Sequence, residues 1–250
     1  MKVAAIYDIH GNLPALEAVL AAIDQALPDL IVVGGDIVSG PMPRAVLERL
    51  MTRGNQVRFI RGNADREVVA AFDGLPLPAN LPEEVREVTT WTAHQLERSH
   101  RDFLAGLPEQ VSLNIDGLGD VLFCHGSPRS DEEMMLVTTP EARLREMIAA
   151  VRQDVVVCGH THMQFDRRID GTRVINAGSV GMPYGEPGAY WLLLGPKVAP
   201  QRTLYDLEQA AASIRATSYP LTQDFADNNV INPASEAEAL SVFEQIAAQS

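Results

Sequence analysis

The sequence predicts an α/β (α+β) fold in which two β-sheets pack together and helices cover their outer faces. The first third of the chain alternates short apolar runs with helical segments, a pattern typical of parallel strands. Several later apolar runs face each other across turn residues, which is typical of antiparallel hairpins. Because the chain shows both signals, we expect two packed, mixed sheets rather than one doubly wound sheet.

The first third reads as strand, helix, strand, helix, strand. We expect strands over residues 2–6, 30–33 and 57–60, a helix from about Asn12 with Pro14 in its first turn, and a second helix over 44–51. The apolar face of the first helix would consist of Leu16, Val19, Leu20, Ile23 and Leu27. Polar residues follow each strand, at the position where open α/β sheets bind their ligands.

The rest of the chain mixes helices with hairpins. We expect helical structure over 82–107, a hairpin of 111–115 with 121–124, a helix over 140–151 capped by Thr139, a strand over 155–158, a hairpin of 165–169 with 172–175, and strands over 190–194 and 203–205. Residues 220–250 would form a linker and a final helix, whose start is marked by Ser235 and Glu238 in capping-box spacing. We expect residues 1–250 to form a single domain.

The composition argues against several classes of protein. The chain has 250 residues, and its 33 acidic against 20 basic residues give a formal net charge of −13. A non-specific grip on nucleic acid needs clustered Lys and Arg, so no nucleic-acid partner is expected. No apolar run approaches the ~20 residues of a membrane span, and the chain reaches Asp8 too early for a signal peptide. Cys124 and Cys158 are predicted to be buried thiols, and we expect a cytoplasmic protein; a homo-oligomer is compatible with the sequence.

Nearly all plausible metal ligands lie in five short motifs that follow apolar runs. The motifs are Asp8-Ile9-His10-Gly11-Asn12, Gly34-Gly35-Asp36, Gly62-Asn63-Ala64-Asp65, Cys124-His125-Gly126 and Gly159-His160-Thr161-His162. Each motif alone is also compatible with an ordinary turn. Together they offer two carboxylates, four imidazoles and one amide, which exceeds the needs of one tetrahedral zinc. These ligand types suit two ions of Mn, Fe, Zn or Ni that share a bridging carboxylate.

In these five motifs the chain resembles the calcineurin-like metallophosphoesterase family, from residue 1 to about residue 205. It is most similar to the small bacterial and archaeal phosphodiesterase-like branch, with which it shares Gly40-Pro41 and the run from Asn176 to Gly181. The resemblance implies a four-layer αββα sandwich with two divalent or trivalent transition-metal ions at the strand ends. One ion would be held by Asp8, His10, Asp36 and His162, and the other by Asp36, Asn63, His125 and His160.

The implied activity is hydrolysis of a small phosphate-ester or nucleotide substrate, either a phosphodiester or a nucleotide-type phosphoanhydride. Two ions ~3.5–4 Å apart can hold a bridging hydroxide that attacks phosphorus in line with the leaving oxygen. Asp8, Asp36, Asn63 and His125 would be catalytic through this centre. The alternative is a non-catalytic protein-interaction scaffold on the same fold, but scaffolds can lose ligands, and all seven positions are filled here.

The sequence departs from the family pattern at two positions. Many members have a histidine directly after the asparagine, where it assists the leaving group; this chain has Ala64, which carries no proton. Protein phosphatases and symmetrical dinucleoside tetraphosphatases have an arginine in the second motif, whereas here Asp36 is followed by Ile37-Val38-Ser39-Gly40. The missing arginine argues against a protein phosphatase.

Several other polar residues have two readings each. Asp65 either caps a loop or orients a ligand. Arg61 and Arg66 flank the asparagine motif, and Arg129, Asp131 and Glu132 follow His125; each could contact substrate or form surface ion pairs. His94 and His100 are expected to be exposed helix residues without a role in the site.

Overall fold

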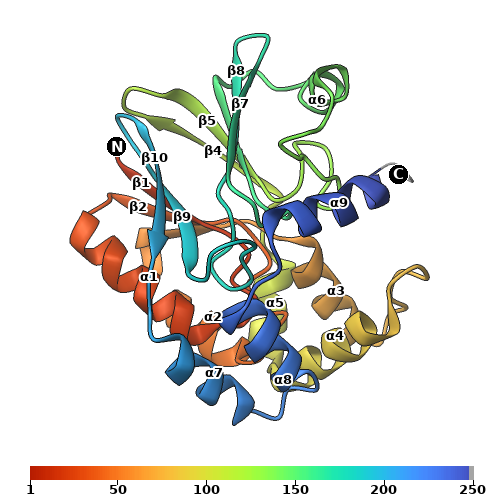
Figure 1. Cartoon of the computed structure of the whole chain (residues 1–250). Helices are drawn as coiled ribbons and strands as arrows, with labels where there is room; N and C mark the ends of the chain where they lie inside the picture. The colour runs from red at the N-terminus through yellow and green to blue at the C-terminus, as the bar shows by residue number, and fades with distance from the viewer. Residues whose placement is uncertain (248–250) are drawn as a thin grey trace.

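The computed structural model describes residues 1–247, which form two five-stranded sheets (Figure 1). The first sheet has the order β10-β9-β1-β2-β3, with β1 (Val3–Ile6), β2 (Leu30–Val33), β3 (Val57–Phe59), β9 (Ala189–Leu194) and β10 (Val198–Thr203). β1, β2 and β3 are parallel, whereas β9 and β10 add antiparallel strands beside β1. Val3 of β1 is in register with Leu30 on one side and Leu194 on the other.

The second sheet has the order β4-β5-β6-β8-β7 and is also mixed. Its strands are β4 (Gln110–Ile115), β5 (Gly119–Cys124), β6 (Val155–Cys158), β7 (Phe165–Ile169) and β8 (Thr172–Asn176). β5, β6 and β8 are parallel, and the hairpin partners β4 and β7 close the two edges. Both sheets are therefore mixed, as the sequence predicts.

The alternation of side chains along β1 explains why the molecule has four layers. Val3, Ala5 and Tyr7 point into a cluster that also contains Phe123 and Val157 of the second sheet. The residues between them on β1 pack instead against the helices on the outer face of the first sheet. On the far side of the second sheet, Leu122, Val156 and Val174 pack against α6 (Glu141–Met147). The order helix, sheet, sheet, helix confirms the predicted αββα sandwich.

The remaining helices surround the two sheets. They are α1 (Leu13–Ala26), α2 (Pro43–Met51), α3 (Asn63–Phe72), α4 (Glu83–Gln95), α5 (Arg98–Ala105), α7 (Leu207–Arg215), α8 (Thr222–Phe225) and α9 (Glu236–Ala247), with a 3-10 helix at Gly54–Gln56 and a π-helix at Ala226–Ile231. α9 begins as predicted, because the Ser235 hydroxyl and the Glu238 carboxylate bond to each other's backbone amides. Within residues 1–247, no helix is long and apolar enough to cross a membrane.

Four expectations about the elements are wrong. Leu27 is 80% exposed, because it ends α1 in the left-handed conformation and does not continue its apolar face. The strand expected over 203–205 is the end of β10, which begins at Val198; Pro200 is tolerated there because β10 is an edge strand. The helix expected over 140–151 ends at Met147, and its N-cap is Pro140. The Thr139 hydroxyl accepts a bond from the Leu136 amide, so it does not cap this helix.

The two helix histidines differ. His94 is exposed, as expected, whereas His100 is only 5% exposed. The His100 ring accepts a hydrogen bond from the backbone amide of Glu97 and so caps α5, and its other nitrogen lies 3.4 Å from a carboxylate oxygen of Glu48. His100 is therefore structural, and the expectation that it is exposed is wrong.

Candidate metal centre

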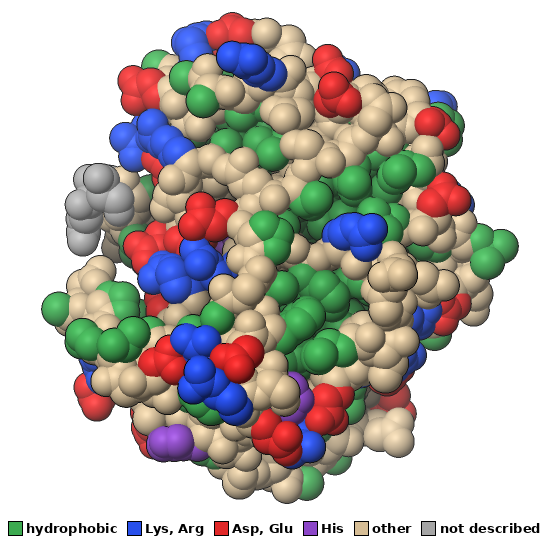
Figure 2. Space-filling view, turned by 180° about the vertical axis from the view of Figure 1, so that it is seen from behind, with side chains coloured by type: hydrophobic (Ala, Val, Ile, Leu, Met, Phe, Trp, Pro, Cys, Tyr) green, Lys and Arg blue, Asp and Glu red, His purple; other side chains and the backbone are tan. Residues whose placement is uncertain are grey.

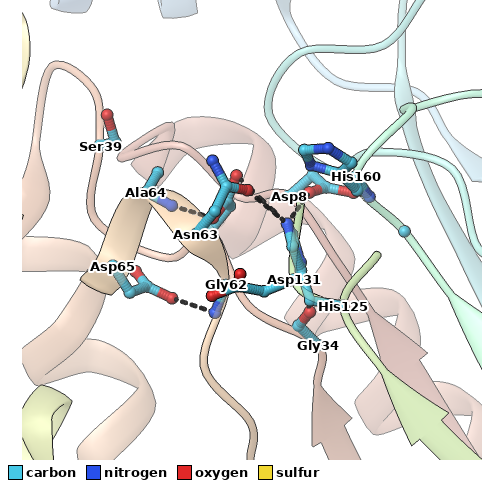
Figure 3. Close-up of polar contacts among 12 residues, drawn as sticks. Asp8, Gly34, Ser39, Gly62, Asn63, Ala64, Asp65, His125, Asp131 and His160 are labelled. Atoms are coloured by element: carbon cyan, nitrogen blue, oxygen red, sulfur yellow. Dashed lines mark hydrogen bonds and ion pairs between the residues drawn. The ribbon is translucent and has the colours of Figure 1, made fainter. Parts of the chain in front are cut away.

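The seven predicted ligands converge between the two sheets, at the carboxyl ends of their parallel strands. They are Asp8 and His10 after β1, Asp36 after β2, Asn63 at the start of α3, His125 after β5, and His160 and His162 after β6. Figure 3 shows His125 between Asn63 and His160. Parallel strands of one sheet end at the same edge, and the packing of the two sheets brings these two edges together. Asp8 after β1 therefore meets His160 after β6, more than 150 positions later in the sequence.

The side chains form two groups, each of which could hold a metal ion. The first contains Asp8, His10 and His162, and the second contains Asp36, His125 and His160; within each group the candidate ligand atoms lie within 4.8 Å of one another. In the first group, Nε2 of His162 lies 3.1 Å from Nε2 of His10 and 3.6 Å from Oδ1 of Asp8. These distances are compatible with ligand atoms that surround one metal ion.

Asp36 lies between the two groups. Its Oδ2 atom is 3.4 Å from Nε2 of His125 in the second group and 3.7 Å from Nε2 of His10 in the first. Its Oδ1 atom accepts a 2.9 Å hydrogen bond from the backbone amide of Ala64, which fixes the carboxylate. The Asn63 amide oxygen lies 3.2 Å from Nε2 of His125, so Asn63 extends the second group.

Backbone carbonyls set the orientation of all four imidazoles. The Nδ1 atoms of His10, His125 and His162 lie 3.1, 2.9 and 2.7 Å from the carbonyl oxygens of Ser39, Gly34 and Met182, respectively. His160 is reversed, because its Nε2 lies 3.1 Å from the carbonyl oxygen of Glu132. A carbonyl accepts only from a protonated nitrogen, so the other nitrogen of each ring keeps a lone pair for an ion.

Burial and mutual charge shift the titration of the site. Burial lowers the pKa of His160 to about 4 and that of His162 well below its usual value, so both rings stay neutral. Burial opposes a charge on His125 as well, but the carboxylates of Asp36 and Asp8 raise its pKa to about 10. Burial raises the pKa of Asp8 well above normal. A bound cation would take the place of these protons, since metal ligands bind in their deprotonated forms.

The backbone of the site is strained. Seven non-glycine residues among the described ones have a positive φ, and five of them are predicted ligands: Asp8, His10, Asp36, His160 and His162. Such conformations cost about 1–3 kcal/mol each and persist where the surroundings impose them. Glycines beside the ligands allow the close approach: a Cβ atom on Gly62 would overlap Oδ1 of Asp36, and one on Gly159 would lie 2.5 Å from Oδ2 of Asp8.

One carboxylate oxygen of Asp8, Oδ1, indicates that this site fits a metal ion. Asp8 is fully buried; its Oδ2 accepts a 2.9 Å hydrogen bond from the His160 amide, but Oδ1 has no partner within the described part of the chain. A buried carboxylate oxygen without a partner is costly. It points at the cluster formed with His162 and His125, whose nitrogens lie 3.6 and 3.9 Å away. The imidazole, carboxylate and amide donors thus fit borderline transition-metal ions.

The charged residues around the site are paired with one another. Arg61 forms an ion pair with Glu109, and Arg66 forms a bidentate pair with Asp131 and a further pair with Glu132. The structure therefore favours the ion-pair reading for Arg61 and Arg66. Arg129 binds Glu133 in the same way, with a 2.5 Å contact to Oε1.

The sequence analysis assigned no role to Asn176 or Tyr184, which contact the motif Gly159-His160-Thr161-His162. The Asn176 side chain donates to the Gly159 carbonyl and to the Thr161 hydroxyl, at 2.7 and 3.0 Å. Tyr184 stacks on the His162 ring with centroids 5.9 Å apart. Asn176 belongs to a motif that the resemblance singles out, so its importance was signalled. Tyr184 has no such signal, because a tertiary contact brings it to the site.

The αββα sandwich and the two ligand groups define a metallophosphoesterase. Residues 1–195 match the calcineurin-like phosphoesterase superfamily domain, so the chain belongs to this superfamily and is a hydrolase.

Comparisons with individual proteins agree with this family assignment. Phosphodiesterase YfcE of Escherichia coli K12 is 28% identical over 203 residues, which cover 77% of this chain and 87% of YfcE. A metallophosphoesterase from Sphaerobacter thermophilus has a similar structure, with a TM-score of 0.71, 29% identity and coverage of 90% of this chain and 98% of that one. Hypothetical protein PH1004 of Pyrococcus horikoshii OT3 has a TM-score of 0.79 at 22% identity, covering 94% and 99% of the two chains, and shows the same fold.

Proposed function

We propose that the protein is a dinuclear metal-dependent phosphoesterase that hydrolyses phosphodiesters or nucleotide-type phosphoanhydrides. The observation that carries this proposal is the position of Asp36, whose Oδ2 atom lies within 3.7 Å of a histidine from each ligand group. A carboxylate in this position suits a bridge between two ions. The similarity to an enzyme named a phosphodiesterase supports the choice of ester.

The residues have distinct tasks in this proposal. Asp8, His10, Asp36 and His162 would hold one ion, and Asp36, Asn63, His125 and His160 would hold the other. When bound, two such ions supply a nucleophile derived from water and stabilise both the attacking and the leaving oxygen of an in-line displacement. The carbonyl contacts of the four rings keep their lone pairs aimed at the centre, and the Ala64 amide keeps Asp36 from rotating.

The surface charge restricts the substrate. On the face drawn in Figure 2, basic side chains lie singly or beside acidic ones, so this face has no continuous basic path for a nucleic-acid backbone. The net charge of −13 also repels polyanions. Two divalent ions exceed the charge of the two carboxylates that hold them, so the site attracts a phosphate locally. A small phosphate ester therefore fits better than a nucleic acid.

The experiment that tests this function is hydrolysis of bis(p-nitrophenyl) phosphate by the purified protein. We expect activity after loading with Mn²⁺ and its loss in excess chelator. A protein that stays inactive with Mn²⁺, Fe²⁺, Zn²⁺ and Ni²⁺, although elemental analysis shows both sites filled, would favour the non-catalytic scaffold instead.

A further inference from the structure

A large pocket opens directly beside the proposed metal centre. Its volume is about 980 Å³, and it begins at Asn63 and His160, two members of the second ligand group. Pockets of about 300–1,000 Å³ are typical of small-molecule sites. A phosphate at the ligand groups would therefore leave room in this pocket for the rest of its substrate.

The C-terminal helix α9 completes the wall of this pocket. Glu244, Ile246 and Ala247 of α9 face the loop at residues 78–81 and the segment 129–147 across the pocket. The match to the superfamily domain ends at residue 195, so α9 lies outside it. This wall is thus a feature of the present chain and not of the matched domain.

Two contacts hold α9 in place over the site. The Phe243 ring lies against the Tyr184 ring in an edge-to-face arrangement at 5.7 Å, and Tyr184 in turn stacks on His162. Ala239 is 6% exposed and is buried together with Leu136 and Met163. The helix that forms the pocket wall therefore contacts a candidate metal ligand indirectly, through the rings of Phe243 and Tyr184.

The pocket has one carboxylate that no basic group compensates. Its lining contains four carboxyl groups and two guanidinium groups, namely Glu67, Glu132, Glu133, Glu244, Arg129 and Arg143. Glu132 pairs with Arg66, and burial raises the pKa of Glu67 to about 7. Both arginines contact the single carboxylate of Glu133, at 2.5 and 3.4 Å. Glu244 forms no ion pair with any described residue. The pocket floor is apolar, since Leu136 and Met147 are buried.

We propose that this pocket binds the alcohol group of a phosphodiester substrate that is not the leaving group. It accepts neutral or positively charged groups with apolar surface. It discriminates against a group that carries a second phosphate. The proposal rests on the phosphoesterase function above. It follows that diesters carrying one phosphate are preferred over nucleotide polyphosphates, which would place further anions beside Glu244.

The test compares three esters with the same p-nitrophenolate leaving group, so that chemistry at phosphorus is matched. They are methyl p-nitrophenyl phosphate, the p-nitrophenyl ester of thymidine 5′-phosphate, and that thymidine ester with an additional 3′-phosphate. For the Mn²⁺-loaded protein, we expect kcat/KM to be higher for the thymidine ester than for the methyl ester. The 3′-phosphate should lower kcat/KM by about tenfold or more, because like charges in a binding site repel.

Two variants with matched controls locate the effect. Glu244→Lys should reduce the penalty of the 3′-phosphate by about threefold or more. The control Glu208→Lys, on the exposed surface of α7, changes the net charge equally and should leave the penalty unchanged. Thr138→Trp should fill the pocket and lower the preference for thymidine over methyl, whereas the exposed neighbour Val137, which does not line the pocket, gives the control Val137→Trp.

The outcomes separate this proposal from the function on which it rests. If the metal-loaded protein does not hydrolyse methyl p-nitrophenyl phosphate, the phosphoesterase function is wrong. If it does so, but the 3′-phosphate carries no penalty or the pocket variants behave like their controls, the substrate pocket is wrong and the phosphoesterase function stands.

Discussion

The carboxylate of Asp65 accepts a 2.9 Å hydrogen bond from the backbone amide of Ile37. The other carboxylate oxygen accepts one of 3.1 Å from the amide of Gly62, at the N-terminus of α3 (Figure 3). Asp65 is fully buried, so both bonds lie out of water. One side chain therefore joins the loop that carries Asp36 to the first turn of α3, which carries Asn63. The structure thus combines the two readings of Asp65, since it caps a helix and orients candidate ligands.

From this contact we predict that Asp65→Asn weakens metal binding. An asparagine keeps the size of the side chain but replaces one acceptor with a donor, which faces an amide of Ile37 or Gly62. Residues that position metal ligands typically contribute about 10–100-fold in affinity or activity. We expect a loss of this size in Mn²⁺ affinity, measured by calorimetric titration.

The control for Asp65 is Asp73→Asn on the same helix. Asp73 caps the C-terminal end of α3, at the opposite end of the helix from the candidate ligand Asn63, and forms a surface ion pair with Arg101. Surface pairs contribute only about 0–1 kcal/mol to stability, so Mn²⁺ affinity should stay at the native value. Equal losses in the two variants would mean that α3 is simply destabilised.

A second prediction concerns Asp36, the proposed bridge. Asp36→Asn removes the charge that both ions would share, so its loss should exceed the ~10–100-fold typical of residues that only position ligands. The measurement is kcat/KM for bis(p-nitrophenyl) phosphate after loading with metal. His94→Ala is the matched control, because His94 is an exposed histidine outside the site. Activity in Asp36→Asn equal to that of the control would contradict the ligand assignment.

The convergence of the seven predicted residues follows from where the strands end. Asp8, Asp36 and His125 come within three residues of the ends of strands with strong apolar character, Asp8 and Asp36 at an edge of the first sheet and His125 at an edge of the second. The mixture of parallel and hairpin signals is enough to predict two packed sheets with helices outside, but alternation along β1 does not say which neighbour each face meets.

The features that sequence reasoning missed depend on tertiary contacts. Asn63 begins a ten-residue helix, but a glycine and an asparagine read locally as a loop. His100 is polar and lies in a polar helix, yet packing against α2 residue Glu48 buries it. The pocket wall formed by α9 could not be foreseen either, because it depends on the edge-to-face contact of Phe243 with Tyr184.

A third prediction concerns stability. The site has a buried carboxylate oxygen without a partner and five ligands in strained conformations, so metal binding should stabilise the fold. Each ion at 100 times its Kd contributes about 2.7 kcal/mol, so two ions contribute about 5 kcal/mol. A chain of this length shifts its Tm by about 2–4 °C per kcal/mol. We therefore expect Mn²⁺ to raise the Tm by about 10–20 °C by scanning calorimetry.

Elemental analysis of the same Mn²⁺-loaded protein gives the number of ions per chain. Elemental analysis after Mn²⁺ loading and desalting should give two ions per chain, and chelator should return the Tm to its starting value. Asp36→Asn should lose most of the increase. One ion per chain at saturation, with full activity, would contradict the dinuclear site.

The last prediction concerns Ala64, at the position where the resemblance to the family implies a histidine that assists the leaving group. Ala64 lies in the first turn of α3, and its amide binds Asp36, so its side chain adjoins the site but cannot give a proton. A general acid typically contributes about 10²–10⁴-fold. Without one at this position, rates should fall steeply as the pKa of the leaving group rises.

We expect Ala64→His to flatten this dependence. The gain should be large for alkyl esters, whose alkoxides need a proton, and small for p-nitrophenyl esters, whose leaving group barely needs one. The measurement is kcat/KM across phosphodiesters of graded leaving-group pKa, for both proteins at equal metal content. A shallow slope in the native protein would mean that another residue already donates the proton. Glu67 would then be the first residue to replace, because it lines the pocket one turn after Asn63 and burial raises its pKa to about 7.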